Sequence, residues 1–419
     1  MKTILVFLII FSIIVVFHEF GHFIMAKRAG VLVREFAIGM GPKLFQYHGE
    51  ETAYTLRLLP LGGYVRMAGL EEYEDELAKG QQVYLVLDEK EHIKKIYLGD
   101  TSDNLAIPFE IHDTDLGEGQ TLTGLPMGQQ EERTYVLSEN TDLLEADGST
   151  TRLAPPHRQI QAASLKNRLL INIAGPFNNF LLGILGFMLL AFLQGGVINS
   201  EPVIGEVVPD SPAAKASLQP GDRIRKIDDT EIEDFAEIEK AVSKEFGRRL
   251  NIIYERQGAK ASTEVTVKEE KDAAGHPYGL IGIKPEIRTN LSAKMSYGLI
   301  QARDMVQMFF SLIGEMFTQG FSINNFGGPV YMYQATSEIS HYGFFALVSW
   351  TAALSINLGL MNLLPIPALD GGKILFNLLE GVLGRPISAK MEGVATLVGA
   401  VLMLILMLAV TWNDIMRFF

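Results

Sequence analysis

Four long apolar segments dominate the hydrophobic pattern of the chain. They run over about residues 4–26, 168–193, 344–366 and 394–412. Each comes close to or exceeds the roughly 20 apolar residues that a helix needs to cross a bilayer. The pattern therefore predicts a polytopic α-helical membrane protein with about four transmembrane helices.

A fifth stretch, Tyr297–Phe317, is apolar but is interrupted by Arg303, Asp304 and Glu315. We expect it to form an amphipathic helix that lies on the membrane surface. Lysine and arginine flank the spans unevenly, and residues 193–214 and 304–343 contain neither. The positive-inside rule therefore places 27–167 and 367–393 in the cytoplasm, and both termini and 194–343 outside.

The segment between the first two spans has two parts. Arg34–Met67 alternates apolar and polar residues, with Gly-Pro and Gly-Gly punctuation that is typical of hairpins. Its apolar content predicts membrane-associated β-strands, which are tolerable at membrane depth only where they line a protein cavity. The following stretch, about 71–155, predicts a small solvated subdomain, in which His92 and His112 lack ligand spacing and are interpreted as surface residues.

The outer segment Glu201–Pro285 is patterned as a compact α+β module. Strand-like PVIGEVV is followed by a short helix at SPAAKASL, a strand at PGDRIRKID, a helix over Asp234–Phe246 and three further strands. This order resembles a circularly permuted bacterial PDZ domain, although Ser217 stands where that fingerprint has glycine. PDZ domains bind extended peptides by strand addition beside a helix. A folded spacer without a ligand remains an alternative.

Composition narrows the possible chemistry. The 419 residues contain no cysteine, which excludes disulfides, thiolate zinc ligands and a cysteine nucleophile. The net charge of −13 argues against a nucleic-acid partner. That charge is concentrated in Glu71–Thr150, which has 20 acidic and 5 basic residues.

The first span carries a candidate metal site in the sequence His18-Glu19-Phe20-Gly21-His22. Two histidines four residues apart project from one face of a helix and can share one Zn²⁺. Glu19 is then placed to take a proton from a metal-bound water. Ionisable residues inside a span are costly, by about 2.5–3.5 kcal/mol each, so their presence favours function over chance.

A third ligand is expected from the far end of the third span. Catalytic zinc commonly has three protein ligands and an open fourth position. The stretch Asn357–Gly372 contains prolines and glycines that break the helix. Asp370, within this stretch, is the natural third zinc ligand. His18 lies about 21 Å from the outer start of its span, toward the cytoplasm, and the third span brings Asp370 to that same side.

These motifs together resemble the site-2 proteases, the intramembrane zinc metalloproteases of the RseP/RasP type. HEFGH, GMGP, LPLGGYVRM, AGPFNNF and NLLPIPALDGG occur in the family's order, with one PDZ-like module. The resemblance covers nearly the whole chain except the acidic insert. It implies cleavage of single-span membrane proteins, such as anti-sigma factors, or of signal-peptide remnants, within the plasma membrane.

The resemblance also implies roles for particular residues. Zinc would be held by His18, His22 and Asp370, with Glu19 as general base. Asn362 would engage the substrate backbone, and the strand Gly63, Tyr64, Val65 and Arg66 would capture an extended substrate. Asn179 matches a further substrate-binding position, which the adjacent Asn178 could share.

The predicted organisation follows from these assignments. Residues 1–70 hold the first transmembrane helix with the membrane-associated β-hairpins, 71–160 the acidic cytoplasmic insert, 161–195 the second transmembrane helix, 196–290 one extracytoplasmic PDZ domain, 291–343 extracytoplasmic amphipathic helices, and 344–419 the third and fourth transmembrane helices with the LDG motif.

Two other functions fit the sequence less well than an active protease. A catalytically inactive membrane PDZ adaptor has no reason to keep Glu19 and a full ligand set in a membrane. A metal or proton transporter requires further ionisable residues inside the bilayer, and the fourth span has none.

Overall fold

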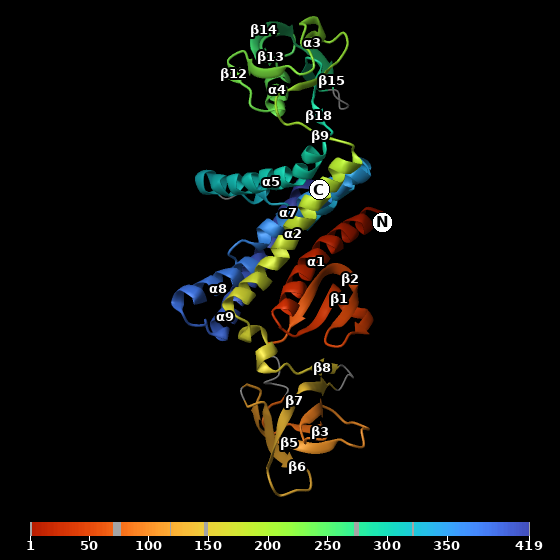
Figure 1. Ribbon diagram of the computed structural model, residues 1–419, viewed down its shortest axis with the longest axis vertical. Helices are drawn as coiled ribbons and strands as arrows, with labels where there is room; N and C mark the ends of the chain where they lie inside the picture. The colour runs from red at the N-terminus through yellow and green to blue at the C-terminus, as the bar shows by residue number, and fades with distance from the viewer. Residues whose placement is uncertain are drawn as a thin grey trace. The chain divides into compact units, whose positions relative to one another are not determined.

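The computed structural model describes residues 2–69, 77–117, 119–145, 150–271, 276–320 and 322–418. The chain divides into two compact units (Figure 1). The first unit comprises Met1–Gly183 and Ala302–Phe419, and the second comprises Ile184–Gln301. Each unit is described by itself below.

Four helices among the described residues are long and apolar enough to cross a membrane, as the hydrophobic pattern predicts. They are α1 (Lys2–Arg28), α2 (Leu165–Leu193), α7 (Phe344–Asn362) and α9 (Ala389–Phe418). Helix α7 ends at Asn362, four residues before the predicted 366, because Pro365 and Pro367 lack the backbone N–H that would continue it. The chain turns there and enters α8 (Asp370–Leu383).

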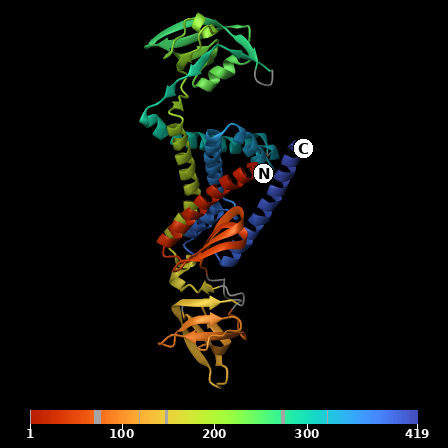
Figure 2. The same ribbon diagram turned by 90° about the vertical axis from the view of Figure 1, so that its right-hand side faces the viewer.

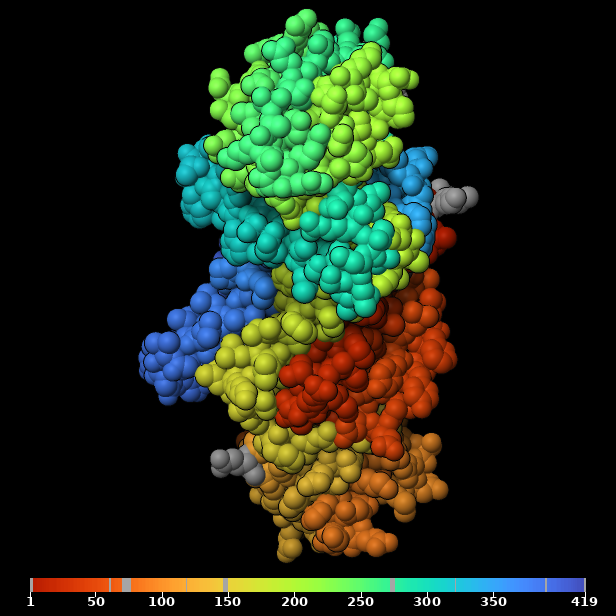
Figure 3. Space-filling view, turned by 45° about the horizontal axis from the view of Figure 1, so that its top comes forward, coloured from red at the N-terminus to blue at the C-terminus, as the bar shows by residue number. Residues whose placement is uncertain are grey.

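The predicted hairpin region is one antiparallel pair of long, bent strands, β1 (Val33–His48) and β2 (Ala53–Met67). Residues 35–38 have partners on both sides, at 53–56 and at 63–66. The 63–66 segment pairs only with β1 within the described residues, so it forms an open edge of the sheet. Both strands pack along α1 (Figures 2 and 3).

The acidic insert is a closed, mainly antiparallel barrel. Its strands are β3 (Gln82–Leu87), β4 (Ile93–Tyr97), β5 (Ile107–Asp115), β6 (Thr121–Pro126), β7 (Arg133–Leu144) and β8 (Thr150–Arg152). The strand order is β4-β3-β5-β6-β7-β8, and an additional β4–β7 pairing closes it. Leu85, Phe109 and Ile111 belong to its buried core. His92 and His112 lie at the surface as predicted, paired with Asp88 and Glu132.

Short helical segments join the larger elements. Turns of 3-10 helix, η2 (Pro156–Arg158) and η3 (Ile160–Ala162), precede α2, and η4 (Ile323–Asn325) precedes α6 (Pro329–His341). The interrupted fifth stretch is helical, as α5 (Leu291–Gln319), and is not among the four candidate spans. Its exposed apolar side chains include Met308 and Phe310, and its placement on the membrane surface stays a prediction.

The second unit has the predicted order of strands and helices. Its elements are β9 (Val197–Ile198), β10 (Ile204–Val207), α3 (Pro212–Lys215), β11 (Arg223–Ile227), β12 (Thr230–Glu231), α4 (Phe235–Val242), β13 (Arg249–Arg256), β14 (Ala259–Thr266), β15 (Lys268–Lys271), β16 (Pro277–Leu280), β17 (Ile283–Pro285) and β18 (Ile287–Arg288). Ser217 has φ of 60°, so it adopts the left-handed conformation for which the PDZ fingerprint uses glycine.

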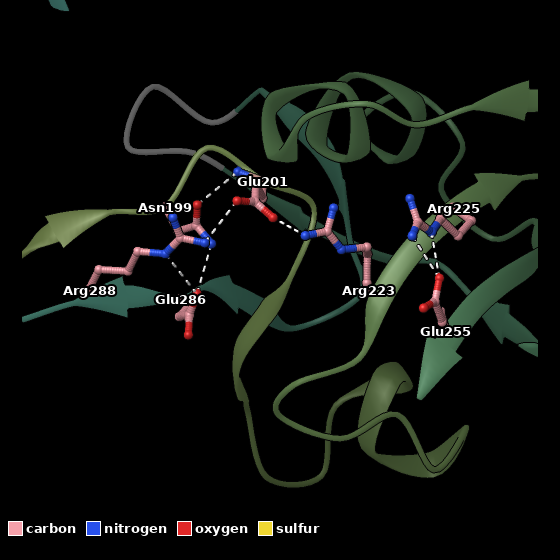
Figure 4. A network of polar contacts seen from close by, with 7 residues as sticks. All are labelled: Asn199, Glu201, Arg223, Arg225, Glu255, Glu286 and Arg288. Atoms are coloured by element: carbon pink, nitrogen blue, oxygen red, sulfur yellow. Dashed lines mark hydrogen bonds and ion pairs between the residues drawn. The ribbon is translucent and has the colours of Figure 1, made fainter. Parts of the chain in front are cut away.

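Strands β9 and β18, where the chain enters and leaves this module, pair with each other and are joined to its body by polar contacts (Figure 4). Glu201 forms ion pairs with Arg223 of β11 and with Arg288 of β18. Asn199 donates a hydrogen bond to Glu286 at 2.7 Å. These contacts tie the two ends of the module together.

Candidate metal centre

Helix α1 presents both predicted histidines to the same point. His18 and His22 are one helical turn apart, and their Nε2 atoms are separated by 3.1 Å. Both residues are only 7% exposed although the helix is apolar throughout. Two buried imidazoles facing each other need a shared partner, because burying polar nitrogens without one is unfavourable.

Asp370 supplies a third atom at this point. Its Oδ2 lies 3.0 Å from Nε2 of His18 and 3.2 Å from Nε2 of His22. Asp370 begins α8, and the turn before it is so tight that a Cβ on Gly371 would lie 2.2 Å from the carbonyl oxygen of Leu364. The glycine therefore allows the backbone approach that brings the carboxylate to the histidines.

The spacing of these three atoms fits a zinc ion. Ligand atoms arranged tetrahedrally at about 2.0–2.1 Å from zinc lie about 3.3 Å apart, close to the observed separations. Nδ1 of His22 hydrogen-bonds to the carbonyl oxygen of Ile171 at 2.7 Å, which commits its proton there and leaves the Nε2 lone pair free. Oδ2 of Asp370 is buried without a hydrogen-bond donor among the described residues. Three electron-pair donors thus converge, as a bound cation requires.

Asn179 lies beside a metal ligand, and its contact with substrate stays a prediction. Its side chain is fully buried on α2, and its amide lies 3.1 Å from Nδ1 of His18. When Nε2 of His18 binds a metal, Nδ1 carries the proton and needs an acceptor. Oδ1 of Asn179 has no hydrogen-bond partner among the residues that the structure describes, so we infer that the amide presents this oxygen to His18. The geometry favours a role in orienting the ligand over direct contact with substrate.

Asn178, the neighbouring candidate, donates from Nδ2 to the carbonyl oxygen of Phe17 at 2.9 Å. Its amide therefore contacts the backbone of α1 and is directed away from the imidazoles of His18 and His22. Pro176 lies between these residues and Ile171, and its missing N–H interrupts the hydrogen bonding of α2 one turn earlier. Pro176 removes the helical donor to the carbonyl oxygen of Asn172, and Nδ1 of His22 bonds to the neighbouring carbonyl oxygen, that of Ile171.

A cleft of about 320 Å³ opens onto the three ligand atoms. It is lined by His18, Glu19, His22, Tyr64, Val65, Met67, Asn172, Asn362, Ala368, Leu369, Asp370 and Lys373. Glu19, the predicted base, therefore shares one cavity with Asn362. Tyr64 and Val65, two of the four predicted strand residues, line the same cavity. Asn172 and Lys373 were not singled out from the sequence, because nothing in their local pattern shows that α2 and α8 meet there.

The remaining predicted strand residues border this cleft less directly. A Cβ built on Gly63 would lie 3.6 Å from Cγ of Glu19, so this part of the strand passes beside the base. Arg66 is exposed and lines a separate polar cavity between the hairpin and the barrel. The open strand edge thus runs alongside Glu19 and the metal ligands.

Charges outside the spans fasten the hairpin to the end of α1 and to the 3-10 turn η2. Glu51 accepts hydrogen bonds from Lys27 at 2.5 Å and contacts Arg158 at 2.8 Å. The Arg158 guanidinium and the Lys27 ammonium lower the pKa of Glu51 to about 2. The carboxylate therefore stays ionised at any pH in which the cell lives.

Comparison with known proteins places this arrangement in a family. The model of peptidase family M50 matches residues 6–406. A full-length relative, the "Probable protease eep" of Enterococcus faecalis, is 44% identical over 426 residues, with 100% of both chains covered. The "Zinc metalloprotease RasP" of Geobacillus kaustophilus is 39% identical, and the alignment covers 100% of this chain and 99% of that relative.

Among solved structures, the PDZ domain of an SdrC-like protein from Listeria monocytogenes matches 21% of this chain and 90% of its own. The identity is 24% and the TM-score is 0.18. The family match, in contrast, includes His18, Glu19, His22 and Asp370 and extends over most of the chain. The predicted resemblance is confirmed: this protein belongs to peptidase family M50.

Proposed function

We propose that this chain is a zinc metalloendopeptidase that cleaves single-span membrane proteins or signal-peptide remnants within the bilayer. The observation that carries the proposal is the convergence of His18, His22 and Asp370 beside Glu19, in a cleft that an open strand edge borders. The full-length relatives named as proteases support the reaction class.

The residues of the site have separate chemical roles. His18, His22 and Asp370 would hold zinc, which would supply a Lewis acid and make water a nucleophile at neutral pH. Glu19 is not one of these three ligands, so it is available as the general base. It accepts the proton from the attacking water and later delivers it to the leaving amine. Asn362 lines the same cleft and contacts the substrate backbone.

The substrate class follows from the surroundings of the site. A transmembrane helix hides its carbonyl groups in its own hydrogen bonds, so it must be unwound before hydrolysis. An open strand edge offers replacement backbone hydrogen bonds to an extended segment. The edge at 63–66 lies beside Glu19, which keeps the captured segment close to the base. Anti-sigma factors and remnant signal peptides provide segments of this kind.

The membrane arrangement is part of the proposal. Four candidate spans and the basic flanks support a multi-pass plasma-membrane protein with the PDZ-like module outside and the metal centre toward the cytoplasm. The module has a groove of about 520 Å³ beside α4, lined by Ile238, Val242, Leu280 and Ile283 among others. Such a groove suits an extended peptide that adds a strand.

A trapping experiment tests the function. Glu19→Gln protein, expressed in its native cell, should hold uncut substrates, and the co-purified peptides should have one apolar segment of about 20 residues. These proteins should accumulate in cells without the active enzyme and decrease when it is restored. An inactive adaptor would instead retain the same partners with or without Glu19, and their amounts would not respond to that residue.

A further inference from the structure

A partly buried polar network joins the strand edge to the neighbouring segments of the hairpin. It consists of Glu35, Arg57 and Tyr64. The hydroxyl of Tyr64 donates to Oε2 of Glu35 at 2.7 Å and accepts from Nη2 of Arg57 at 2.6 Å. Nη2 of Arg57 also donates to Oε1 of Glu35 at 3.0 Å. Each of the three side chains therefore contacts the other two.

The network joins three separate segments of the sheet. Glu35 belongs to the central 35–38 segment, which pairs on both sides, and Tyr64 belongs to the open edge. Arg57 reaches a third segment, because its Nη1 donates to the carbonyl oxygen of Gly41 at 2.7 Å. Its guanidinium carbon also stands 5.3 Å from the centre of the Tyr64 ring.

The ionised groups of the network are largely removed from solvent. The side chain of Arg57 is 17% exposed and that of Glu35 is 12% exposed. Burial alone would raise the pKa of Glu35, but the hydrogen bonds from Tyr64 and Arg57 hold it below its ordinary value. Removing one member of a buried ion pair leaves the other charge uncompensated, so such pairs fix geometry strongly.

Tyr64 connects the network to the metal centre. Tyr64 lines the cleft with His18, His22 and Asp370, and the preceding Gly63 passes beside Glu19. Fixing Tyr64 therefore fixes the position of the edge relative to the base. The edge has to offer backbone hydrogen bonds that replace those inside the substrate helix. A rigid edge does this better than a mobile one, because a mobile strand loses conformational entropy when it binds.

We propose that Glu35 and Arg57 are positioning residues that hold the substrate-capturing edge through Tyr64. The inference rests on the proposed function, because it assumes that this edge receives the peptide. Neither residue touches the metal ligands, so the contribution concerns substrate capture and not zinc binding or proton transfer.

The test compares Arg57→Lys, Glu35→Gln and Tyr64→Phe with the unchanged protein. Two single-span substrates are used, one helical and one loosened by Gly and Pro near the cut site. We expect KM for the helical substrate to rise about tenfold, as the loss of a hydrogen bond to a charged group implies, with kcat and zinc content unchanged. KM for the loosened substrate should change about twofold or less. Equal losses on both substrates, or a loss confined to kcat, would overturn the proposal.

Glu51→Gln is the matched control. It breaks ion pairs of the same hairpin that are directed to Lys27 and Arg158, away from the cleft, and it should leave the ratio of the two KM values unchanged. If Glu51→Gln changes the ratio of the two KM values as much as Arg57→Lys does, any loosening of the hairpin is sufficient to weaken capture of the helical substrate. Arg57 then has no specific role.

Hydrogen exchange separates failure of this proposal from failure of the proposed function. Amides of residues 62–67 should exchange faster in Arg57→Lys and Tyr64→Phe than in the unchanged protein, whether or not any substrate is cut. If exchange is unchanged in both variants, the network does not hold the edge. If exchange is faster but the unchanged protein cuts neither substrate, the positioning holds and the protease function fails.

Discussion

Gly175 of α2 lies directly against the imidazole of His22. A Cβ at position 175 would stand 2.2 Å from Nε2 of His22 and 2.8 Å from Cε1 of His18. Real side chains do not approach this closely, and these atoms belong to the two rings that converge on the metal site. The absence of a side chain at 175 is therefore a condition for both imidazoles to occupy their places.

Gly175→Ala should accordingly lose zinc and activity together, because the added methyl group displaces the imidazoles. Zinc content of the purified protein, measured by mass spectrometry, checks this. Gly393→Ala on α9 is the control, because a Cβ there meets no atom of the described residues within 4 Å. That variant should keep its zinc. Normal zinc content in Gly175→Ala would show that α2 can move aside without harm.

Asn179→Leu should weaken zinc binding about 10- to 100-fold, the usual effect of losing the partner that orients a histidine ligand. Competition with a zinc chelator measures the affinity. Asn178→Leu is the matched control, since its amide donates to the backbone of Phe17 and not to a metal ligand in the described part of the chain, and its zinc affinity should stay near that of the unchanged protein. If Asn179→Leu raises KM and leaves zinc affinity intact, Asn179 contacts substrate after all.

The ion pairs of Glu51 predict a pH-dependent term in stability. Its pKa in the folded chain, about 2, is below the ordinary value of 4.5. The contribution is therefore fully present above pH of about 4.5 and is lost as the pH falls toward about 2. The melting temperature of Glu51→Gln should lie below that of the unchanged protein at pH 6, and the gap should narrow progressively below pH 4. A gap of constant size would exclude this linkage.

The proposed membrane arrangement predicts which positions react with a reagent that is added outside the cell. The chain has no cysteine, so single cysteines can be introduced at Asp229 and Glu131 without background labelling. Both sites are exposed in the structure. A membrane-impermeant thiol reagent should label Asp229→Cys in intact cells and Glu131→Cys only after permeabilisation. The reverse pattern would invert the topology.

The sequence was most informative where a local pattern determines the chemistry. Helical spacing is enough to place His18 and His22 on one face of α1, and long apolar runs are enough to identify the four candidate spans. Asp370 was also recognisable, because proline and glycine ended the third span beside a carboxylate on the same side as His18. The three atoms that these arguments chose lie within 4.8 Å of one another.

Other features depend on contacts that no local pattern reveals. Asn179 reads as a polar residue in a span, and only the packing of α2 against α1 turns its amide toward His18. Tyr64, Arg57 and Glu35 are separated along the chain, and the irregular register of β1 and β2 is what brings them together. Likewise, Asn172 and Lys373 enter the cleft through the packing of helices distant in sequence.

The most direct measurement is cleavage of one single-span substrate by purified protein in liposomes, with the products mapped by mass spectrometry. The unchanged protein should cut inside the apolar segment of the substrate. Glu19→Gln should bind as much zinc yet give no product, because the three ligands remain and the base is lost. Turnover by Glu19→Gln at a rate similar to that of the unchanged protein, or cuts that fall only outside the apolar segment, would contradict the account.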